Sequence, residues 1–292
     1  MKLAVLARAK INLAIDVLHR QEDGYHQVRM LLQSISLADR LFFDPRERDI
    51  RLSCSSNLLD PGENLVYKAA LALKNHKPSG QRRGVHIHLE KNIPLEAGLG
   101  GGSSDAAATL VALNQLWGMN LPLKDLQEIG FSLGADIPFC LTGGTALVEG
   151  LGERISPLPP FPWGPLVLVK PPFGLSTAGV YGSLPLAKIT ERPDFGSLMG
   201  AVKAGKAEEA LGLMVNVLEE GTGGKRKEIL ALKEALEEAG ALKALMSGSG
   251  SVVFGFFRGT TEAAEAAKLF RSRGFWSENV TVSPAGVELK AL

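Results

Sequence analysis

Residues 94–108 read PLEAGLGGGSSDAAA, and this stretch decides how the rest of the chain is interpreted. Alternating apolar and polar residues over 85–91 predict a half-buried strand before it, and apolar residues at helical spacing over 105–116 predict a helix after it. Glycines let the backbone approach a ligand without Cβ clashes. The free N–H groups and positive dipole end of the helix would point at the same place. The stretch therefore predicts an anion site, whose usual occupant is phosphate.

The same stretch differs from two well-known phosphate-binding motifs. It lacks the lysine of a Walker A loop, and no acidic residue ends a second strand at the distance expected for a dinucleotide-binding fold. The plainer alternative is a flexible turn in which Ser104 or Asp105 caps the helix. Because a carboxylate beside a polyphosphate repels it, capping is the expected role of Asp105.

A lysine and an asparagine lie close together near the N-terminus, within residues 9–13. Lys10 and Asn12 would share one face of a strand, because side chains at i and i+2 point the same way. Together they suit the binding of a hydroxyl or a phosphate oxygen. The alternative is a solvated strand face.

Residues 23–26 read DGYH and place Tyr25 and His26 directly after a glycine turn. This pair could stack on a planar ring and hydrogen-bond to it. The alternative is a partly buried tyrosine and a surface histidine in a hairpin.

Three further segments carry candidate groups. Asp136 lies in GADIPF, residues 134–139, where it could act as a general base or orient a hydroxyl, or else cap a helix or form an Asx turn. Residues 248–250, Gly-Ser-Gly, form either a tight turn or a second oxygen-binding loop. Residues 176–177, near Tyr181, are typical of a helix cap.

Length and composition set the class of protein. The chain has 292 residues, room for two domains, and a net charge of +1, which argues against nucleic-acid binding by bulk charge. Cys54 and Cys140 are not at zinc spacing, and no apolar run approaches the length of a membrane span. We expect a soluble, cytoplasmic protein with reduced thiols and no membrane partner.

Five prolines between residues 156 and 165 mark the clearest break, because proline continues neither a helix nor a central strand. We therefore expect one domain over 1–158 and another over 159–292. The second carries helical patterns over 226–238 and 261–273 and strand patterns over 251–257 and 279–282, which together predict an α+β domain.

Taken together, these segments resemble the GHMP family of small-molecule kinases. Lys10 to Asn12 is similar to its N-terminal strand, Pro94 to Ala106 to its phosphate loop, and 248–250 to its C-terminal Gly-Ser-Gly loop. The extra glycine and Asp105 in the phosphate loop depart from the general pattern. This variant of the phosphate loop resembles that of family members whose acceptor is a sugar alcohol carried on cytidine diphosphate. The same members are resembled by residues 23–26, 134–139, 150–153 and 176–177.

The resemblance covers most of the chain and implies a fold, a reaction and its cofactors. The fold is α+β with two domains, the first similar to domain 2 of ribosomal protein S5 and the second ferredoxin-like, with the active site in the cleft between them. The reaction is transfer of phosphate from ATP, with Mg²⁺, to a hydroxyl group. Asp136 would accept or orient the hydroxyl proton, while Lys10 would keep Asp136 ionised and stabilise the transferring phosphoryl group.

The resemblance also implies the remaining contacts. Tyr25 and His26 would bind cytosine, with Asn12, Thr177 and Tyr181 as further substrate contacts. Asn64 and Lys91 would lie near the nucleotide. The loop that wraps the ATP phosphates would consist of Pro94, Leu95, Glu96, Ala97, Gly98, Leu99, Gly100, Gly101, Gly102, Ser103 and Ser104.

Three rival functions remain open from the sequence. A homoserine or mevalonate kinase of the same family is disfavoured by Tyr25 and His26, because those acceptors have no aromatic base. A non-catalytic ATP-binding sensor would be favoured if Lys10 or Asp136 were missing. RNA binding through the S5-like domain is disfavoured because a chain of net charge +1 lacks the basic patch that such binding needs. The protein could act as a monomer or a homodimer, with no nucleic-acid partner and no protein-bound metal.

Overall fold

The structure is a computed structural model that describes residues 2–22, 24–55, 62–76 and 83–291. Residue 23, part of the DGYH segment, lies outside the described residues. Within the described ranges, no helix combines the length and apolar character needed to cross a membrane. Among the described residues, neither Cys54 nor Cys140 forms a disulfide.

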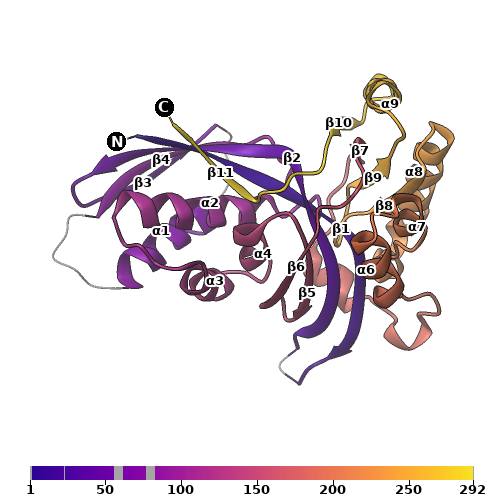
Figure 1. Ribbon diagram of the computed structural model, residues 1–292, viewed down its shortest axis with the longest axis horizontal. Helices are drawn as coiled ribbons and strands as arrows, with labels where there is room; N and C mark the ends of the chain where they lie inside the picture. Colours follow the sequence, from indigo (N-terminus) through magenta and orange to yellow (C-terminus); the bar gives the residue numbers. More distant parts are fainter. Residues whose placement is uncertain (1, 23, 56–61, 77–82, 292) are drawn as a thin grey trace.

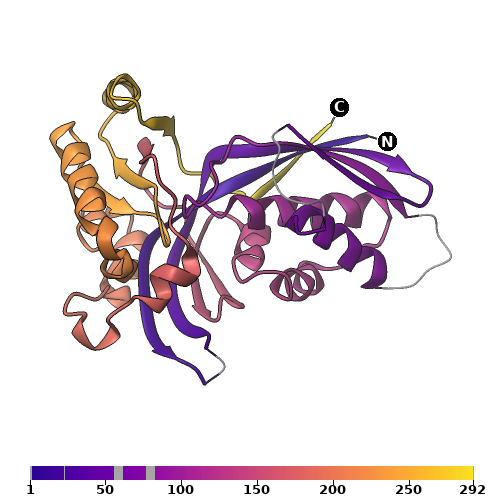
Figure 2. The ribbon, with the colours of Figure 1, turned by 180° about the vertical axis from the view of Figure 1, so that it is seen from behind.

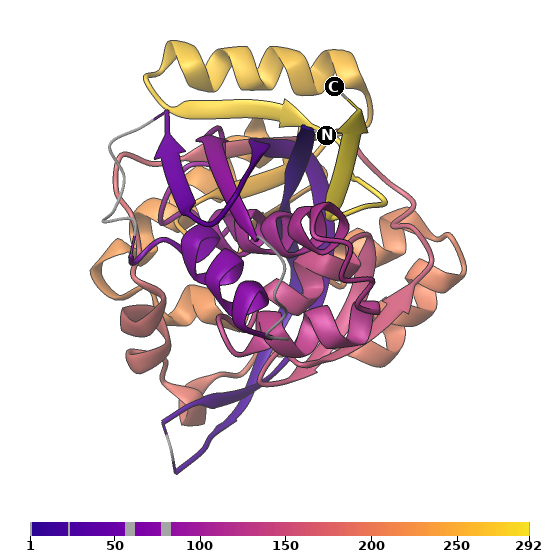
Figure 3. The same ribbon diagram turned by 90° about the vertical axis from the view of Figure 1, so that its left-hand side faces the viewer.

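The first sheet is built on a long antiparallel pair, β1 (Leu3–Arg20) and β2 (His26–Arg46). Its order is β11-β1-β2-β4-β3, with β5 on β2 and β6 on β5. Helices α1 to α4 lie together on one side of it (Figures 1 and 3). The other strands are β3 (Ile50–Cys54), β4 (Gly84–Glu90), β5 (Thr145–Gly150), β6 (Arg154–Leu158) and β11 (Val287–Ala291), and the helices are α1 (Leu65–His76), α2 (Gly101–Leu116), α3 (Leu123–Phe131) and α4 (Ile137–Thr142).

The second sheet has the order β10-β7-β9-β8, and the helices α8 and α9 pack against it (Figure 2). Its strands are β7 (Leu166–Lys170), β8 (Lys243–Met246), β9 (Val253–Phe256) and β10 (Trp276–Val280). The helices are α5 (Thr177–Gly182), α6 (Phe195–Lys203), α7 (Ala207–Gly212), α8 (Arg226–Glu238) and α9 (Thr260–Ser272), with short 3₁₀ turns at 186–188, 217–221 and 223–225.

The β1–β2 pair joins the two sheets into one molecule. Ala9, Ile11 and Leu13 of β1 belong to the same buried cluster as Leu166 and Phe254 of the second sheet. This part of β1 is therefore covered on both faces, which explains why the strand is buried without interruption from Ala9 to Val17. The expected α+β architecture is confirmed.

The chain does not divide cleanly at the proline-rich segment. Strands β7 to β10 follow it and form the second sheet, but β11 returns to pair with β1 in the first. The boundary between 158 and 159 stays a prediction, and residues 287–291 belong by pairing to the first sheet. Pro157 lies in β6, an edge strand, where a missing N–H is tolerated.

Two predicted boundaries were wrong. Helix α2 begins at Gly101, although the apolar spacing indicated a start near residue 105. The last strand of the second sheet is Trp276–Val280, earlier than the predicted 279–282.

Candidate active site

A pocket of about 870 Å³ lies where elements of both sheets meet. Its walls come from β1, the loop before α2, the turn before α4, helix α5 and the loop after β8. Of the predicted residues, it is lined by Lys10, Asn12, Tyr25, His26, Lys91, 94–103, Asp136, Thr177 and Tyr181, together with Gly248 and Ser249. The structure thus brings together nearly all of the residues that sequence analysis singled out.

The glycine-rich loop has the backbone geometry of an anion site. Gly98 and Gly100 have φ of +73° and +70°, a region that favours glycine. A Cβ on Gly98 would lie 1.9 Å from the carbonyl oxygen of Ser247, so no other residue fits. Helix α2 starts directly after Gly100, and Gly101 and Gly102 in its first turn line the pocket. Free N–H groups at this helix end suit a phosphate.

Neither predicted capping residue caps α2. Gly100 occupies the N-cap position, while Ser104 and Asp105 are buried inside the helix. The Ser104 hydroxyl donates to the carbonyl oxygens of Arg8, at 2.7 Å, and Gly100, at 3.0 Å. Ser104 therefore shapes the loop from within, whereas Ser103 lines the pocket.

The glycine-rich loop is hydrogen-bonded to the Gly-Ser-Gly loop of the second sheet. The N–H groups of Ser251 and Val252 donate to the carbonyl oxygens of Glu96 and Ala97, each at 3.2 Å. The Ser247 hydroxyl donates to the carbonyl of Gly98 at 2.9 Å. The two loops therefore form one wall of the pocket.

Lys10 and Asp136 meet in the pocket from different elements. The Lys10 ammonium lies 3.5 Å from Asp136 Oδ2 and donates to Asn12 Oδ1 at 2.8 Å. Register shifts in the β1–β2 ladder flank Lys10 and Asn12 on both sides, and such irregularities re-aim side chains. The alternative of a solvated strand face is wrong, because Lys10 and Asn12 are both buried.

Asp136 precedes α4, but its carboxylate makes no capping hydrogen bond. Its side chain is 33% exposed, so the carboxylate remains open to the pocket. A carboxylate beside a lysine, at the end of an anion site, can orient a hydroxyl toward a phosphate.

Aromatic side chains form the far end of the pocket. The rings of His26 and Tyr181 are 5.2 Å apart and tilted by 44°, and Tyr25 stands exposed at the rim. Burial, and secondarily the charge of Asp136, raises the pKa of the Tyr181 hydroxyl, so it stays protonated. Burial, and then the charge of Arg20, lowers the pKa of His26 below its ordinary value. These groups can bind a planar, uncharged ring.

Thr177 and Asn64 have local partners. The Thr177 hydroxyl lies 3.0 Å from the Ser249 hydroxyl, which joins α5 to the Gly-Ser-Gly loop. Ser176 caps α5 by accepting from the N–H of Gly179, as predicted for residues 176–177. Asn64 accepts from the N–H of Val66 at the start of α1, and its neighbour Leu65 lines the pocket instead. A role for Asn64 near the nucleotide stays a prediction.

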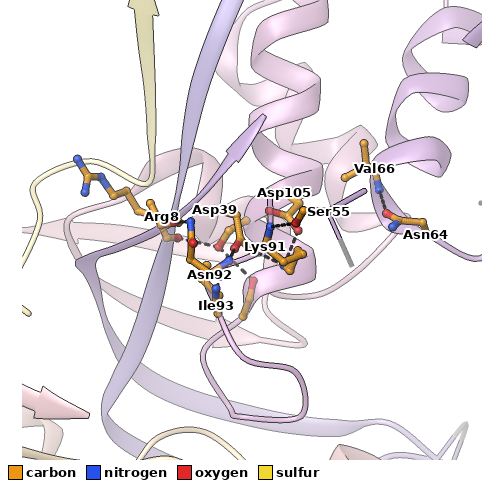
Figure 4. Close-up of polar contacts among 12 residues, drawn as sticks. Arg8, Asp39, Ser55, Asn64, Val66, Lys91, Asn92, Ile93 and Asp105 are labelled. Carbon is orange, nitrogen blue, oxygen red and sulfur yellow. Dashed lines mark hydrogen bonds and ion pairs between the residues drawn. The ribbon is translucent and has the colours of Figure 1, made fainter. Parts of the chain in front are cut away.

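Sequence analysis missed two residues at the site. Arg20 ends β1 and lines the pocket beside Gly24. The sequence signal that could have identified it is its position three residues before the DGYH turn, where a cation lies close to the predicted ring-binding pair. Asp39 lies on β2 and binds Lys91, whose side chain is only 9% exposed (Figure 4). No local pattern marks Asp39, because its partner is 52 positions away.

Family models and individual relatives of this chain point to the same family of kinases. The GHMP kinases N terminal domain matches residues 64–144, and GHMP kinases C terminal matches residues 198–274. The 4-diphosphocytidyl-2-C-methyl-D-erythritol kinase of Pelotomaculum thermopropionicum is 47% identical over 93% of this chain and 94% of its own. The enzyme of the same name from Alkaliphilus oremlandii is 46% identical over 89% of each chain.

Solved structures agree with this. A crystal structure of 4-(cytidine 5'-diphospho)-2C-methyl-D-erythritol kinase superposes with a TM-score of 0.79 and 35% identity, covering 97% of this chain and 99% of that chain. Homoserine kinase from Cytophaga hutchinsonii superposes with a TM-score of 0.76 over 99% of this chain and 97% of its own, but at 20% identity this likeness shows the fold alone. The identity and coverage of these matches, with both domains matched in order, make the chain a member of the GHMP kinase family.

Proposed function

We propose that the chain transfers the γ-phosphoryl group of ATP to the 2-hydroxyl of 4-diphosphocytidyl-2-C-methyl-D-erythritol, giving the 2-phosphate and ADP in isoprenoid precursor synthesis by the non-mevalonate route. The observation that carries this is the Lys10–Asp136 pair, which lies in one pocket with the glycine-rich loop and the aromatic groups. Relatives at 46–47% identity bear the name of this kinase. A cytoplasmic location and action as a monomer or homodimer belong to the same proposal.

The chemistry follows from the position of each group. The N–H groups at the start of α2 and the Ser103 hydroxyl bind the phosphates. Asp136 accepts the hydrogen bond of the acceptor hydroxyl and takes its proton as the new oxygen–phosphorus bond forms and the bond to ADP breaks. Lys10 stabilises the negative charge on the transferring group. Thr177 and Asn12 hold the acceptor between them.

The residues of the pocket fit ATP, because the glycine-rich loop, in which a Cβ on Gly98 would clash with the Ser247 carbonyl, leads directly into the N-terminus of α2. Mg²⁺ would enter with the nucleotide: the described residues hold no group of three or more His, Cys, Asp or Glu side chains suited to a metal. Magnesium commonly binds through phosphates and water with few protein ligands. Its contribution would be to neutralise phosphate charge.

At the acceptor end, Tyr25 and Tyr181 provide aromatic surfaces and His26 provides ring nitrogens. Because the pKa of His26 is lowered, the histidine is neutral near pH 7 and offers one donor and one acceptor. This set suits a pyrimidine base. Homoserine and mevalonate have no group that would use it.

The test is a coupled assay of ADP release with MgATP, comparing the cytidine compound with homoserine and mevalonate. We expect turnover of the cytidine compound alone. Tyr25→Ala should raise KM for it by about five- to a hundredfold, the usual worth of stacking on a base, whereas Tyr25→Phe keeps the ring and should stay near wild type. Turnover of homoserine or mevalonate instead would contradict the proposal. Turnover of none, with ATP still bound, would favour the sensor.

A further inference from the structure

The glycine-rich loop is anchored at its beginning by one aspartate. Asp39 of β2 accepts from the N–H of Asn92 and, at 2.8 Å, from that of Ile93. The Asn92 side chain donates in return to the carbonyl of Ala38 at 2.9 Å. The backbone directly before Pro94 is therefore fixed to the first sheet.

Lys91 connects this anchor to the far end of the loop. Its ammonium donates to Asp39 and, at 2.7 Å, to Asp105 Oδ2 in α2 (Figure 4). The three side chains are 9%, 0% and 3% exposed. A Cβ on Gly101 would lie 3.3 Å from the ammonium, so Lys91 lies against the first residue of α2. One cation thus ties the residues before the loop to the helix that follows it.

The charges of this group do not balance if both carboxyls are ionised. Asp39 accepts from three donors, two of them backbone N–H groups. Asp105 accepts from Lys91 alone, and its Oδ1 is buried with no hydrogen-bond partner in the described structure. A buried anion with one donor and one unpartnered oxygen is costly, whereas a neutral acid is much less so.

The charged groups around Asp105 also favour an ionised Asp39 beside a neutral Asp105. Burial raises the pKa of Asp105 well above its ordinary value; the charge of Lys91 opposes this, whereas the charge of Asp39 and a side-chain hydrogen bond with Asp39 add to it. Burial tends to lower the pKa of Lys91, but the carboxyls of Asp105 and Asp39 raise it, so it remains an ammonium. On α4, burial raises the pKa of Cys140 to about 12, so that thiol is uncharged.

We propose that Lys91 is a positioning residue that closes the glycine-rich loop by binding an ionised Asp39 and a protonated Asp105. The inference rests on the proposed function only in that this loop is the one that holds the ATP phosphates. It gives Asp105 a role other than the predicted capping of α2. In this proposal Lys91 acts on the nucleotide only through the loop and makes no direct contact with it.

The first measurement needs neither substrate nor activity. Infrared difference spectra of the wild-type protein and Asp105→Asn at pH 7 should contain one carbonyl stretch of a protonated carboxylic acid, present in the wild type only. Its absence from the wild type would overturn the assignment of the proton, whatever the enzyme phosphorylates.

The second measurement is binding of a non-hydrolysable MgATP analogue by calorimetry. Asp105→Ala removes the tie at the helix and should raise Kd by about ten- to a hundredfold, the cost of a displaced binding group. Asp105→Asn replaces a neutral acid by a neutral amide and should stay within about twofold, since the Lys91 contact is retained. Asp39→Asn should resemble Asp105→Ala, because an amide cannot accept from all three donors.

These variants distinguish positioning from direct contact. If Lys91 were a phosphate ligand, Asp105→Ala would leave Kd unchanged or lower it, and the proposal would fail. It would also fail if Asp105→Asn were as weak as Asp105→Ala.

Lys91→Met should raise KM for ATP while changing KM for the acceptor by less than about twofold, and Lys124→Met, on the exposed face of α3, is the control. If Lys91→Met does not fold, Lys91→Met with Asp39→Asn removes the unpaired charge. That double variant should regain its melting temperature without regaining ATP affinity. Regaining both would assign Lys91 a purely structural role and overturn the proposal.

Discussion

Two lysines line the same pocket, and each is paired with carboxyl groups, yet the two groups are built differently. The Lys10 ammonium is 3.5 Å from Asp136 Oδ2, and the Asp136 side chain is 33% exposed. Lys91 is held between Asp39 and Asp105, which are almost fully buried. The first group is open and loosely paired, and the second is closed and tightly paired.

The difference teaches what separates a reactive ion pair from a structural one. Asp136 makes no capping hydrogen bond and faces the pocket, so its lone pairs are available to an incoming hydroxyl. The oxygens of Asp39 are all used by the protein itself. Access to the carboxylate, more than the presence of a lysine, distinguishes the two groups.

The largest effect expected is at Asp136. Asp136→Asn keeps the shape of the side chain but cannot take a proton, so kcat should fall by about 10²–10⁴ while KM for ATP changes little. Steady-state assay of ADP release measures both constants. Asp49→Asn, at a side chain 70% exposed, is the control and should match wild type. A kcat within tenfold of wild type would remove Asp136 from the chemistry.

Replacing each lysine by methionine tests whether the two groups contribute differently to the free energy of unfolding. Lys91→Met leaves Asp39 buried without its cation and should lower the free energy of unfolding by about 3–5 kcal/mol. Lys10→Met leaves Asp136 partly in water and removes the donor to Asn12 Oδ1, so it should cost less, about 1–3 kcal/mol, although activity is lost. Urea unfolding of both variants measures the difference. Equal losses at the two positions would mean that the groups are not distinct.

A pH series tests the charge distribution in the closed group. The folded protein holds a proton on Asp105 that the unfolded chain releases, because burial raises the pKa of Asp105. The associated stability is fully present below the ordinary aspartate pKa and is lost as pH rises toward the raised one. Asp105→Asn removes this dependence, so its stability relative to wild type should rise as the pH increases above the ordinary aspartate pKa. Parallel stability curves would show that Asp105 ionises normally in the fold.

The smallest effect is expected at the acceptor end, where Arg20 acts on His26. The charge of Arg20 is the second cause, after burial, of the lowered pKa of His26. Arg20→Gln should therefore raise that pKa, and the acidic limb of acceptor binding should move to higher pH. The pH profile of kcat/KM for the acceptor measures the shift, with Arg258→Gln, at an exposed side chain, as control. A shift to lower pH would contradict the assignment.

Most of the candidate site could be predicted from the sequence, because its groups lie in short, local motifs. The segments around Lys10, Tyr25 and Asp136 each carry their signal within a few positions. The family resemblance then brought these motifs together. The structure adds that they line one pocket.

The parts that could not be predicted depend on distant contacts. Three consecutive glycines favour a turn over a helix, yet α2 begins among them because the loop and helix are held by Lys91, Asp39 and neighbouring backbone. Asp39 lies in the long strand β2 with no motif of its own. The pairing of β11 with β1 could not be predicted either, because no local pattern in residues 287–291 indicates a partner near the N-terminus.

The return of β11 to the first sheet has a consequence for how the protein is made. A ribosome delivers the N-terminal strand early, but the partner that pairs Leu3 to Ala7 is residues 287–291. Until those residues have been synthesised, the edge of the first sheet is the long strand β1 in place of the short strand β11, with unpaired backbone groups at Leu3 to Ala7 that could recruit another chain. A product interrupted after residue 286 would contain every group of the pocket and still display that edge, which chaperones and proteases could read as the sign of an unfinished chain.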